Sequence, residues 1–143
     1  MDYKELINSF KTILDDSSII TGSSLKSRFY HIWKTDIPLD SICLLQPKST
    51  KEVSSILKIC YDNDQEVIIH GGLTNLVGST IANNNQVVVS LEKMNKIIEI
   101  DDQGKTLTCE SGVIIEDLIN VADRKSTRLN SSHVRTSRMP SSA

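Results

Sequence analysis

The chain has 143 residues and a formal net charge of −2 at pH 7, and this length suits one ordinary domain rather than two. The charge is uneven: residues 1–122 hold 11 Lys and Arg against 17 Asp and Glu, a balance of −6, whereas residues 123–143 hold 5 against 1, a balance of +4. No apolar run approaches the roughly 18 to 20 residues of a membrane helix, so we expect no membrane span. No basic patch with interleaved aromatic residues indicates nucleic-acid binding.

The beginning of the chain and its cysteines indicate a compartment. The first residues, MDYKELINSF, lack the basic and apolar regions of a secretory signal and the Arg-rich character of a transit peptide. Cys43, Cys60 and Cys109 are odd in number and widely spaced, which suits a reducing compartment and offers no zinc or disulfide framework. We therefore expect a cytoplasmic protein.

The first 40 residues predict a helix and a loop. Apolar residues recur at helical spacing over residues 2–15 and predict an amphipathic helix with one face toward a core. Residues 25–40 contain several aromatic side chains without clear periodicity, and Pro38 argues against regular structure there. We interpret this segment as a loop with an aromatic anchor.

A strand, a capped helix and a second strand follow in about thirty residues. Residues 41–45 read as a buried strand, and Ser49 with Glu52 forms a capping box for a helix that reaches about Tyr61. Residues 67–69 are all β-branched and apolar, which is typical of a strand covered on both faces. This order predicts a βαβ unit with a parallel sheet.

The rest of the ordered pattern predicts one more strand, a hairpin and a helix. QVVVS at 86–90 reads as a strand, and residues 96–101 and 106–109 flank a turn at DQG, as in a hairpin. Gly112 ends the last strand, and an apolar pattern from Ile115 to Ala122 begins a helix.

Residues 123–143 differ in composition from everything before them. A disordered basic tail is one interpretation. However, DRKSTRLNSSH from Asp123 resembles the conceptual translation of a common sequencing-library adapter, and SRMPSSA resembles the translation of that adapter's far end. Two matches in the expected order favour an artefactual segment, which we exclude from fold reasoning. We therefore expect the native protein to continue differently after Ala122.

The stretch VIIHGGLTNLVGST, residues 67–80, carries the chemistry of the chain. Its glycines permit close approach of a ligand, and successive exposed N–H groups with the hydroxyls of Thr74 and Ser79 suit phosphate oxygens. Ligands of open α/β sheets bind at the carboxyl ends of parallel strands, where this loop falls. It is neither a P-loop nor the GxGxxG dinucleotide fingerprint. A tight turn that only reverses the strand is an equally good interpretation from the residues alone.

Four motifs between Ile42 and Leu118 occur in order: QPKSTKEVSSILKIC, HGGLTNLVGST, VVVSLEKMNKI and LTCESGVIIEDL. They resemble the first half of the flavin domain in the FAD-linked D-2-hydroxyacid dehydrogenases, a family that includes D-lactate, D-2-hydroxyglutarate and glycolate dehydrogenases. The resemblance implies an α+β fold, the N-terminal subdomain of a PCMH-type (vanillyl-alcohol-oxidase-like) FAD-binding domain, truncated, with a small parallel or mixed sheet and flanking helices. Residues 1–40 would be a lead-in and residues 41–122 a partial FAD-binding domain.

The resemblance also implies the site and the reaction. The glycine loop would wrap the FAD pyrophosphate, His70 would adjoin it, and Gly112 would lie against the flavin; the cradle residues are Gly71, Gly72, Thr74, Asn75, Leu76, Val77, Gly78 and Ser79. The parent enzyme would move a hydride from a D-2-hydroxyacid to FAD and pass electrons to an unidentified acceptor, while this piece alone would be inactive. No catalytic residue or metal ligand can be assigned. Relatives often carry a small or amide residue at Leu73 and glycine at Ser79, so the substrate subgroup stays open.

Alternatives stand beside these expectations. A flavoprotein of the same fold with another substrate and a non-catalytic phosphate-binding module both accommodate the loop. His70 is better interpreted as bonding backbone than as touching the cofactor. His31 has no evident partner, Asp101 and Asp102 suit a solvated turn, and Lys93 with Lys96 suits a solvated face.

Overall fold

The computed structural model describes residues 2–33, 37–101 and 103–124. It divides into two compact units between Met94 and Asn95. The predicted boundaries at residues 40 and 122 do not coincide with this division, and the predictions for residues 125–143 lie outside the described part.

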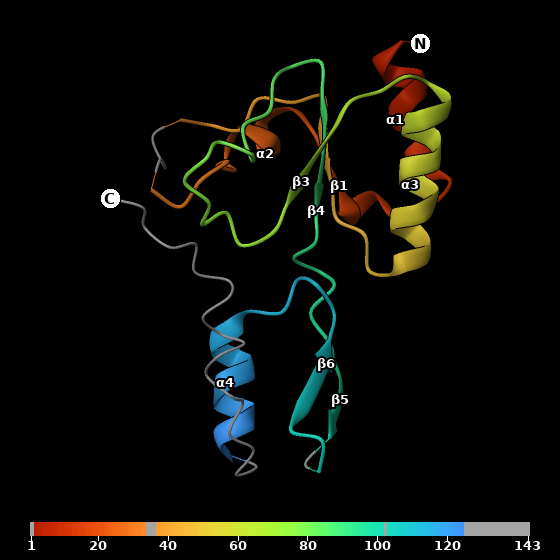
Figure 1. The fold of residues 1–143 in the computed structure, drawn as a ribbon. Helices are drawn as coiled ribbons and strands as arrows, with labels where there is room; N and C mark the ends of the chain where they lie inside the picture. Colours follow the sequence, from red (N-terminus) through yellow and green to blue (C-terminus); the bar gives the residue numbers. More distant parts are fainter. Residues whose placement is uncertain (1, 34–36, 102, 125–143) are drawn as a thin grey trace. The chain divides into compact units, whose positions relative to one another are not determined.

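The first unit is built on a four-stranded sheet with the strand order β1-β2-β4-β3 (Figure 1). β2 and β3 both run parallel to β4, and β1 pairs antiparallel with β2. Its elements in chain order are α1 (Tyr3–Lys11), a 3-10 turn (Asp16–Ser18), β1 (Ile19–Ile20), α2 (Gly22–Lys26), β2 (Cys43–Leu45), α3 (Thr50–Asp62), β3 (Val67–His70) and β4 (Val87–Ser90).

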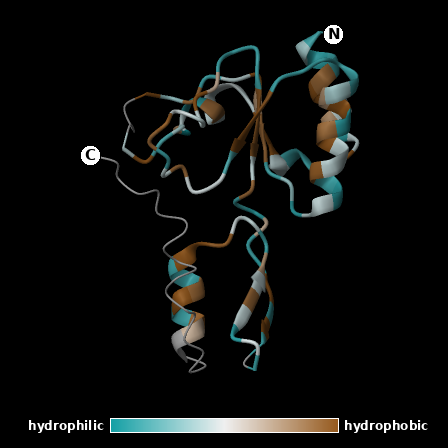
Figure 2. Ribbon diagram, viewed as in Figure 1, coloured by the Kyte–Doolittle hydropathy of each residue, from teal (hydrophilic) through white to brown (hydrophobic). Residues whose placement is uncertain are grey.

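The sheet separates two small cores because side chains alternate along each strand. On one face, Val87 and Val89 pack with Phe10 of α1 and Ile56 of α3, all fully buried. On the other face, Val88 packs with residues of α2 and the segment before β2, in a smaller cluster. Figure 1 shows α1 and α3 side by side on one side of the strands and α2 on the other. The apolar residues concentrate on the strands and the inner faces of these helices (Figure 2).

The helix after β2 begins at the predicted cap. The Ser49 hydroxyl accepts the Glu52 backbone N–H at 3.2 Å, which satisfies one free donor of the first turn. The Glu52 carboxylate accepts the backbone N–H of Lys48 at 2.7 Å, one residue before the position that a capping box uses. The capping prediction is confirmed, with this shift.

β2 and β3 are parallel in one sheet, as predicted, and β4 lies between them, because both strands pair with it. Some details of the predicted fold need correction. β3 is therefore an edge strand, and Ile69 is 45% exposed rather than covered on both faces. The first helix ends at Lys11 instead of residue 15, and the predicted loop at 25–40 is preceded by the short helix α2, which the sequence pattern did not reveal.

The second unit contains the predicted hairpin and helix. β5 (Ile97–Asp101) pairs antiparallel with β6 (Thr106–Cys109), and α4 (Ile115–Arg124) follows. The Asp101 carboxylate accepts the backbone N–H groups of Gln103 and Gly104, each at 2.9 Å, so it organises the turn, as expected for an Asp at this position. Asp102 lies outside the described residues. Over the described ranges, no helix combines the length and apolarity that a bilayer crossing requires.

Candidate functional site

The glycine loop, residues 71–80, leaves the sheet at the carboxyl end of β3. β3 and β4 are parallel and in register up to His70 and Ser90, and the Leu91 N–H extends the ladder by donating to the His70 carbonyl at 3.0 Å. The loop therefore stands at the edge of the sheet where α/β proteins bind ligands.

The two adjacent glycines are not required by the packing of the chain itself. A Cβ built on Gly71 or Gly72 meets no atom within 4 Å, and neither residue has a left-handed φ. Gly78 differs, because its φ of +75° and a 3.2 Å approach of Ile81 both favour glycine. Leu73 adopts a φ of +56°, which is costly for a branched side chain. The open side of Gly71 and Gly72 is the space that a closely approaching ligand would need.

The His70 side chain joins the two ends of the glycine loop. Its ring is 2% exposed, and Nε2 lies 2.8 Å from the Thr80 carbonyl, so the two ends of the loop are joined. Burial lowers the pKa of His70, against weaker opposing effects of the Thr80 carbonyl and the Glu92 charge. The ring is neutral at pH 7, and its Nε2–H donates to the carbonyl. This is the backbone-bonding interpretation of His70; its contact with FAD stays a prediction.

Asn75 organises the far half of the loop. Its Oδ1 accepts the Ser79 backbone N–H at 3.2 Å, and its Nδ2 donates to the Thr80 hydroxyl at 3.0 Å. The amide of Ser79 is therefore occupied within the chain and is not free for an anion. The Asn75 side chain thus shapes the loop from inside, and its backbone N–H is what remains for the cofactor contact that the sequence predicts.

His31, which the sequence left without a partner, holds the same loop from outside. It is 9% exposed, its Nδ1 accepts the Trp33 backbone N–H at 3.1 Å, and its Nε2 bonds the Asn75 carbonyl. The neighbouring Ile32 N–H donates to the Leu73 carbonyl at 3.3 Å. His31 and Asn75 are 44 residues apart in the sequence, so no local pattern could have indicated this contact.

Several donors of the loop have no acceptor in the chain. Among the described residues, no protein group accepts the backbone N–H of Gly71, Gly72, Thr74 or Leu76. Gly71, Gly72 and Thr74 are exposed, and the Thr74 hydroxyl is a further donor. A group of free N–H donors fits a pyrophosphate, whose oxygens accept hydrogen bonds and carry negative charge.

A hollow of about 440 Å³ lies between the loop and the segment that holds it. Aromatic and apolar side chains dominate its lining, and among the described residues that line it none is acidic or basic apart from the histidine; they are Tyr30, His31, Trp33, Asn75, Leu76, Gly78 and Ile81. Leu76 and Val77 are 86% and 73% exposed at the tip of the loop. The hollow thus offers apolar surface beside a loop whose free N–H groups suit a phosphate.

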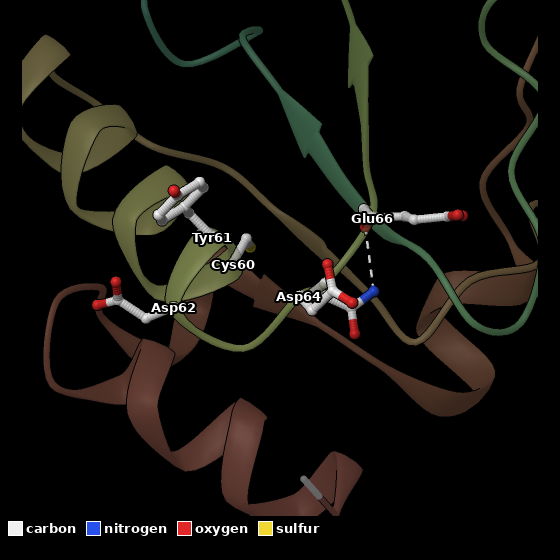
Figure 3. A pocket seen from close by; sticks show the side chains of 6 residues that line it. Cys60, Tyr61, Asp62, Asp64 and Glu66 are labelled. Atoms are coloured by element: carbon white, nitrogen blue, oxygen red, sulfur yellow. Dashed lines mark hydrogen bonds between the residues drawn. The ribbon is translucent and has the colours of Figure 1, made fainter.

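A second hollow, of about 530 Å³, lies at the opposite end of β3 (Figure 3). Three carboxylates line it, those of Asp62, Asp64 and Glu66, and Figure 3 shows those of Asp62 and Glu66 pointing apart. Gln65 donates to the Glu66 carbonyl at 3.1 Å. The negative lining makes this the poorer place for a phosphate ligand.

The remaining candidates lie elsewhere. Gly112 is in the turn between β6 and α4 of the second unit, and its proximity to a flavin stays a prediction. The expectation of a solvated Lys93 is wrong: its ammonium group donates to the Ser17 carbonyl and the Ser18 hydroxyl, both at 3.1 Å, and so holds the turn before β1. Lys96 is exposed.

Comparisons with known proteins give this geometry a family context. Residues 41–137 match the model of the family described as FAD binding domain. A probable mitochondrial D-2-hydroxyglutarate dehydrogenase of Oryza sativa subsp. indica is 37% identical over 119 residues, which is 83% of this chain and 21% of the relative. A D-lactate dehydrogenase of Anaerostipes hadrus is 31% identical, over 85% of this chain and 26% of the relative. The chain thus spans about a fifth to a quarter of these relatives.

Solved structures agree with the described fold. An alkyldihydroxyacetonephosphate synthase superposes with a TM-score of 0.75 at 17% identity, covering 87% of this chain and 25% of that one. The predicted fold class is confirmed: the chain has the fold of the first part of a PCMH-type FAD-binding domain.

Proposed function

Because the chain belongs to the FAD binding domain family, we propose that its glycine loop forms part of the FAD site of a D-2-hydroxyacid dehydrogenase. The observation that carries the proposal is the set of unpartnered backbone N–H groups at Gly71, Gly72 and Thr74, beside glycines that no protein atom crowds. The names of the rice and Anaerostipes relatives support a D-2-hydroxyacid as the substrate class.

The residues of this chain would bind and orient the cofactor. The free N–H groups of the loop would donate to pyrophosphate oxygens, and the Thr74 hydroxyl would add a donor. The aromatic lining of the 440 Å³ hollow would exclude water from an apolar part of the ligand. Bound FAD would supply the hydride acceptor for oxidation at C2 of the hydroxyacid, and a base would take the hydroxyl proton, so that a 2-oxoacid would result.

Other parts of the proposal concern the whole protein. Regions outside the described residues would supply the remaining cofactor contacts and the catalytic groups. The electron acceptor would be a separate partner. A cytoplasmic location stays a prediction from the sequence, and the rice relative is named as mitochondrial. The artefactual origin of residues 123–143 also stays a proposal, and the family match extends past Asp123 to residue 137.

The cofactor site is tested by titrating the 15N-labelled chain with FAD, ADP and riboflavin at millimolar concentrations. FAD and ADP share the pyrophosphate, whereas riboflavin has the flavin ring without phosphate. We expect FAD and ADP to shift the amide signals of Gly71, Gly72 and Thr74, and riboflavin to leave them in place. Equal shifts with riboflavin, or no shift with any ligand at saturating concentration, would contradict the proposal.

A further inference from the structure

The segment at residues 31–33 makes three hydrogen bonds that together fix how the glycine loop presents its backbone. Nδ1 of His31 accepts the Trp33 N–H, so Nδ1 carries no proton and the neutral ring has its proton on Nε2. That proton is donated to the Asn75 carbonyl. The Ile32 backbone N–H likewise donates to the Leu73 carbonyl. Two carbonyls of the loop therefore point toward this segment.

The geometry of the peptide group determines where the N–H groups that follow these two carbonyls point. In a planar trans peptide group, the carbonyl of one residue and the N–H of the next point in opposite directions. When the carbonyls of Leu73 and Asn75 face the segment, the N–H groups of Thr74 and Leu76 face away from it. Neither N–H has a protein acceptor among the described residues. The bonds from 31–33 thus direct these two donors outward.

The chain just before the segment at residues 31–33 also makes several contacts. Arg28 forms a two-point ion pair with Glu92, with N–O distances of 3.0 and 3.1 Å. The Leu39 N–H donates to the Arg28 carbonyl at 2.7 Å, and Phe29 bridges to Pro38. These contacts anchor the chain two to three residues before His31.

We propose that His31 is a positioning residue for the anion cradle: its Nε2–H holds the Asn75 carbonyl so that the N–H group of Leu76 is presented to a pyrophosphate, beside the Thr74 N–H that the Ile32 bond to the Leu73 carbonyl orients. This inference rests on the proposed function for the identity of the ligand, but the orientation of the loop stands on the structure alone. His31 does not itself touch the ligand in this role. Without its bond, the Asn75–Leu76 peptide is free to rotate, and binding must then overcome the cost of ordering it.

Two variants separate the donor from the volume of the ring. His31→Phe fills the space without a donor, and His31→Gln offers an amide N–H near the position of Nε2. Both variants are titrated with inorganic pyrophosphate. His31→Phe should bind it about tenfold more weakly than the wild type, because one hydrogen bond that orders the loop before binding is lost. His31→Gln should recover most of this affinity. Equal affinities in the wild type and His31→Phe would overturn the inference.

Two ligand-free measurements keep the test independent of the proposed function. A long-range 1H–15N spectrum of the wild type should show the Nε2–H tautomer of His31, and the Nδ1–H tautomer would overturn the inference even if His31→Phe fails to fold. The amide signal of Leu76 should move in His31→Phe without any ligand, and an unchanged Leu76 signal would also overturn it. If wild-type signals ignore pyrophosphate while these two results hold, the proposed function fails and the positioning of the loop by His31 stands.

Discussion

The two ends of β3 carry hollows of similar size, about 530 Å³ at the amino end and about 440 Å³ at the carboxyl end, yet their chemistry is opposite. Three carboxylates line the first, while the described lining of the second is aromatic, apolar or uncharged apart from His31, and the loop that forms one of its walls also carries the free N–H donors of Gly71, Gly72 and Thr74. A phosphate ligand would be repelled at one end and held at the other. The comparison shows that the volume of a hollow does not identify the site, whereas the sign of its charge and the direction of its backbone groups do.

The largest expected effect compares two amide side chains that bridge backbone at the two ends. Asn75→Leu removes the partner of the buried Thr80 hydroxyl and of the Ser79 N–H, and it should lower the free energy of unfolding by about 2 kcal/mol. The matched variant Gln65→Leu removes bonds to the carbonyls of Glu66 and Asn85 at the amino end, where the bonds are exposed, and should cost less than about 1 kcal/mol. Urea unfolding measures both losses in free energy. Equal losses would contradict the expectation that the hydrogen bonds of Asn75 stabilise the fold more than those of Gln65.

Gly72→Ala tests whether the open space beside the glycines belongs to a ligand. The added Cβ meets no protein atom within 4 Å and the φ is not left-handed, so the melting temperature should stay unchanged or rise slightly. FAD affinity should fall about tenfold, equivalent to 1.4 kcal/mol, because the Cβ occupies the approach to the backbone. Asp64→Asn at the amino end is the control and should leave FAD affinity unchanged, since Asn tolerates the positive φ of 52° at that position. A tenfold loss in the control as well would remove the distinction between the ends.

The sequence allowed much of this arrangement to be predicted where the signals are local. The Ser49 and Glu52 cap, the apolar strands and the hairpin turn at Asp101 each depend on neighbours within a few residues. The insertion of β4 between β2 and β3 could not be predicted in the same way, because the order of strands depends on which distant segments pair. The role of His31 was missed for the same physical reason, since its partner at Asn75 is brought close only by the fold. β1 and α2 are too short, at 2 and 5 residues, to produce a periodic pattern.

His70 makes the carboxyl end sensitive to pH. Its pKa in the folded chain lies below the ordinary value of 6.5, chiefly because burial disfavours the charged ring. The unfolded chain therefore binds a proton at a higher pH than the folded chain does, and the stability that the neutral ring supports is complete above about pH 6.5 and decreases as the pH falls below it. The free energy of unfolding, measured from pH 8 to pH 5, should fall more steeply in the wild type than in His70→Gln. Parallel profiles would show that His70 is not the titrating group.

The smallest effect is expected at the amino end, from the ion pair between Lys58 and Asp62 at the end of α3. The ammonium group lies 2.9 Å from a carboxylate oxygen, but the two side chains are 75% and 50% exposed, so water and salt screen the attraction. Lys58→Met keeps most of the aliphatic stem and should lower the free energy of unfolding by no more than about 0.5 kcal/mol, with FAD affinity unchanged. Because this variant also leaves Asp62 unpaired beside the acidic hollow, a decrease in FAD affinity would mean that the charge at one end of β3 acts on the other, and a stability loss above about 1 kcal/mol would mean that the ion pair is not screened as expected. An effect within the expected limit leaves the carboxyl end as a cradle set by its own bonds to His31, His70 and Asn75.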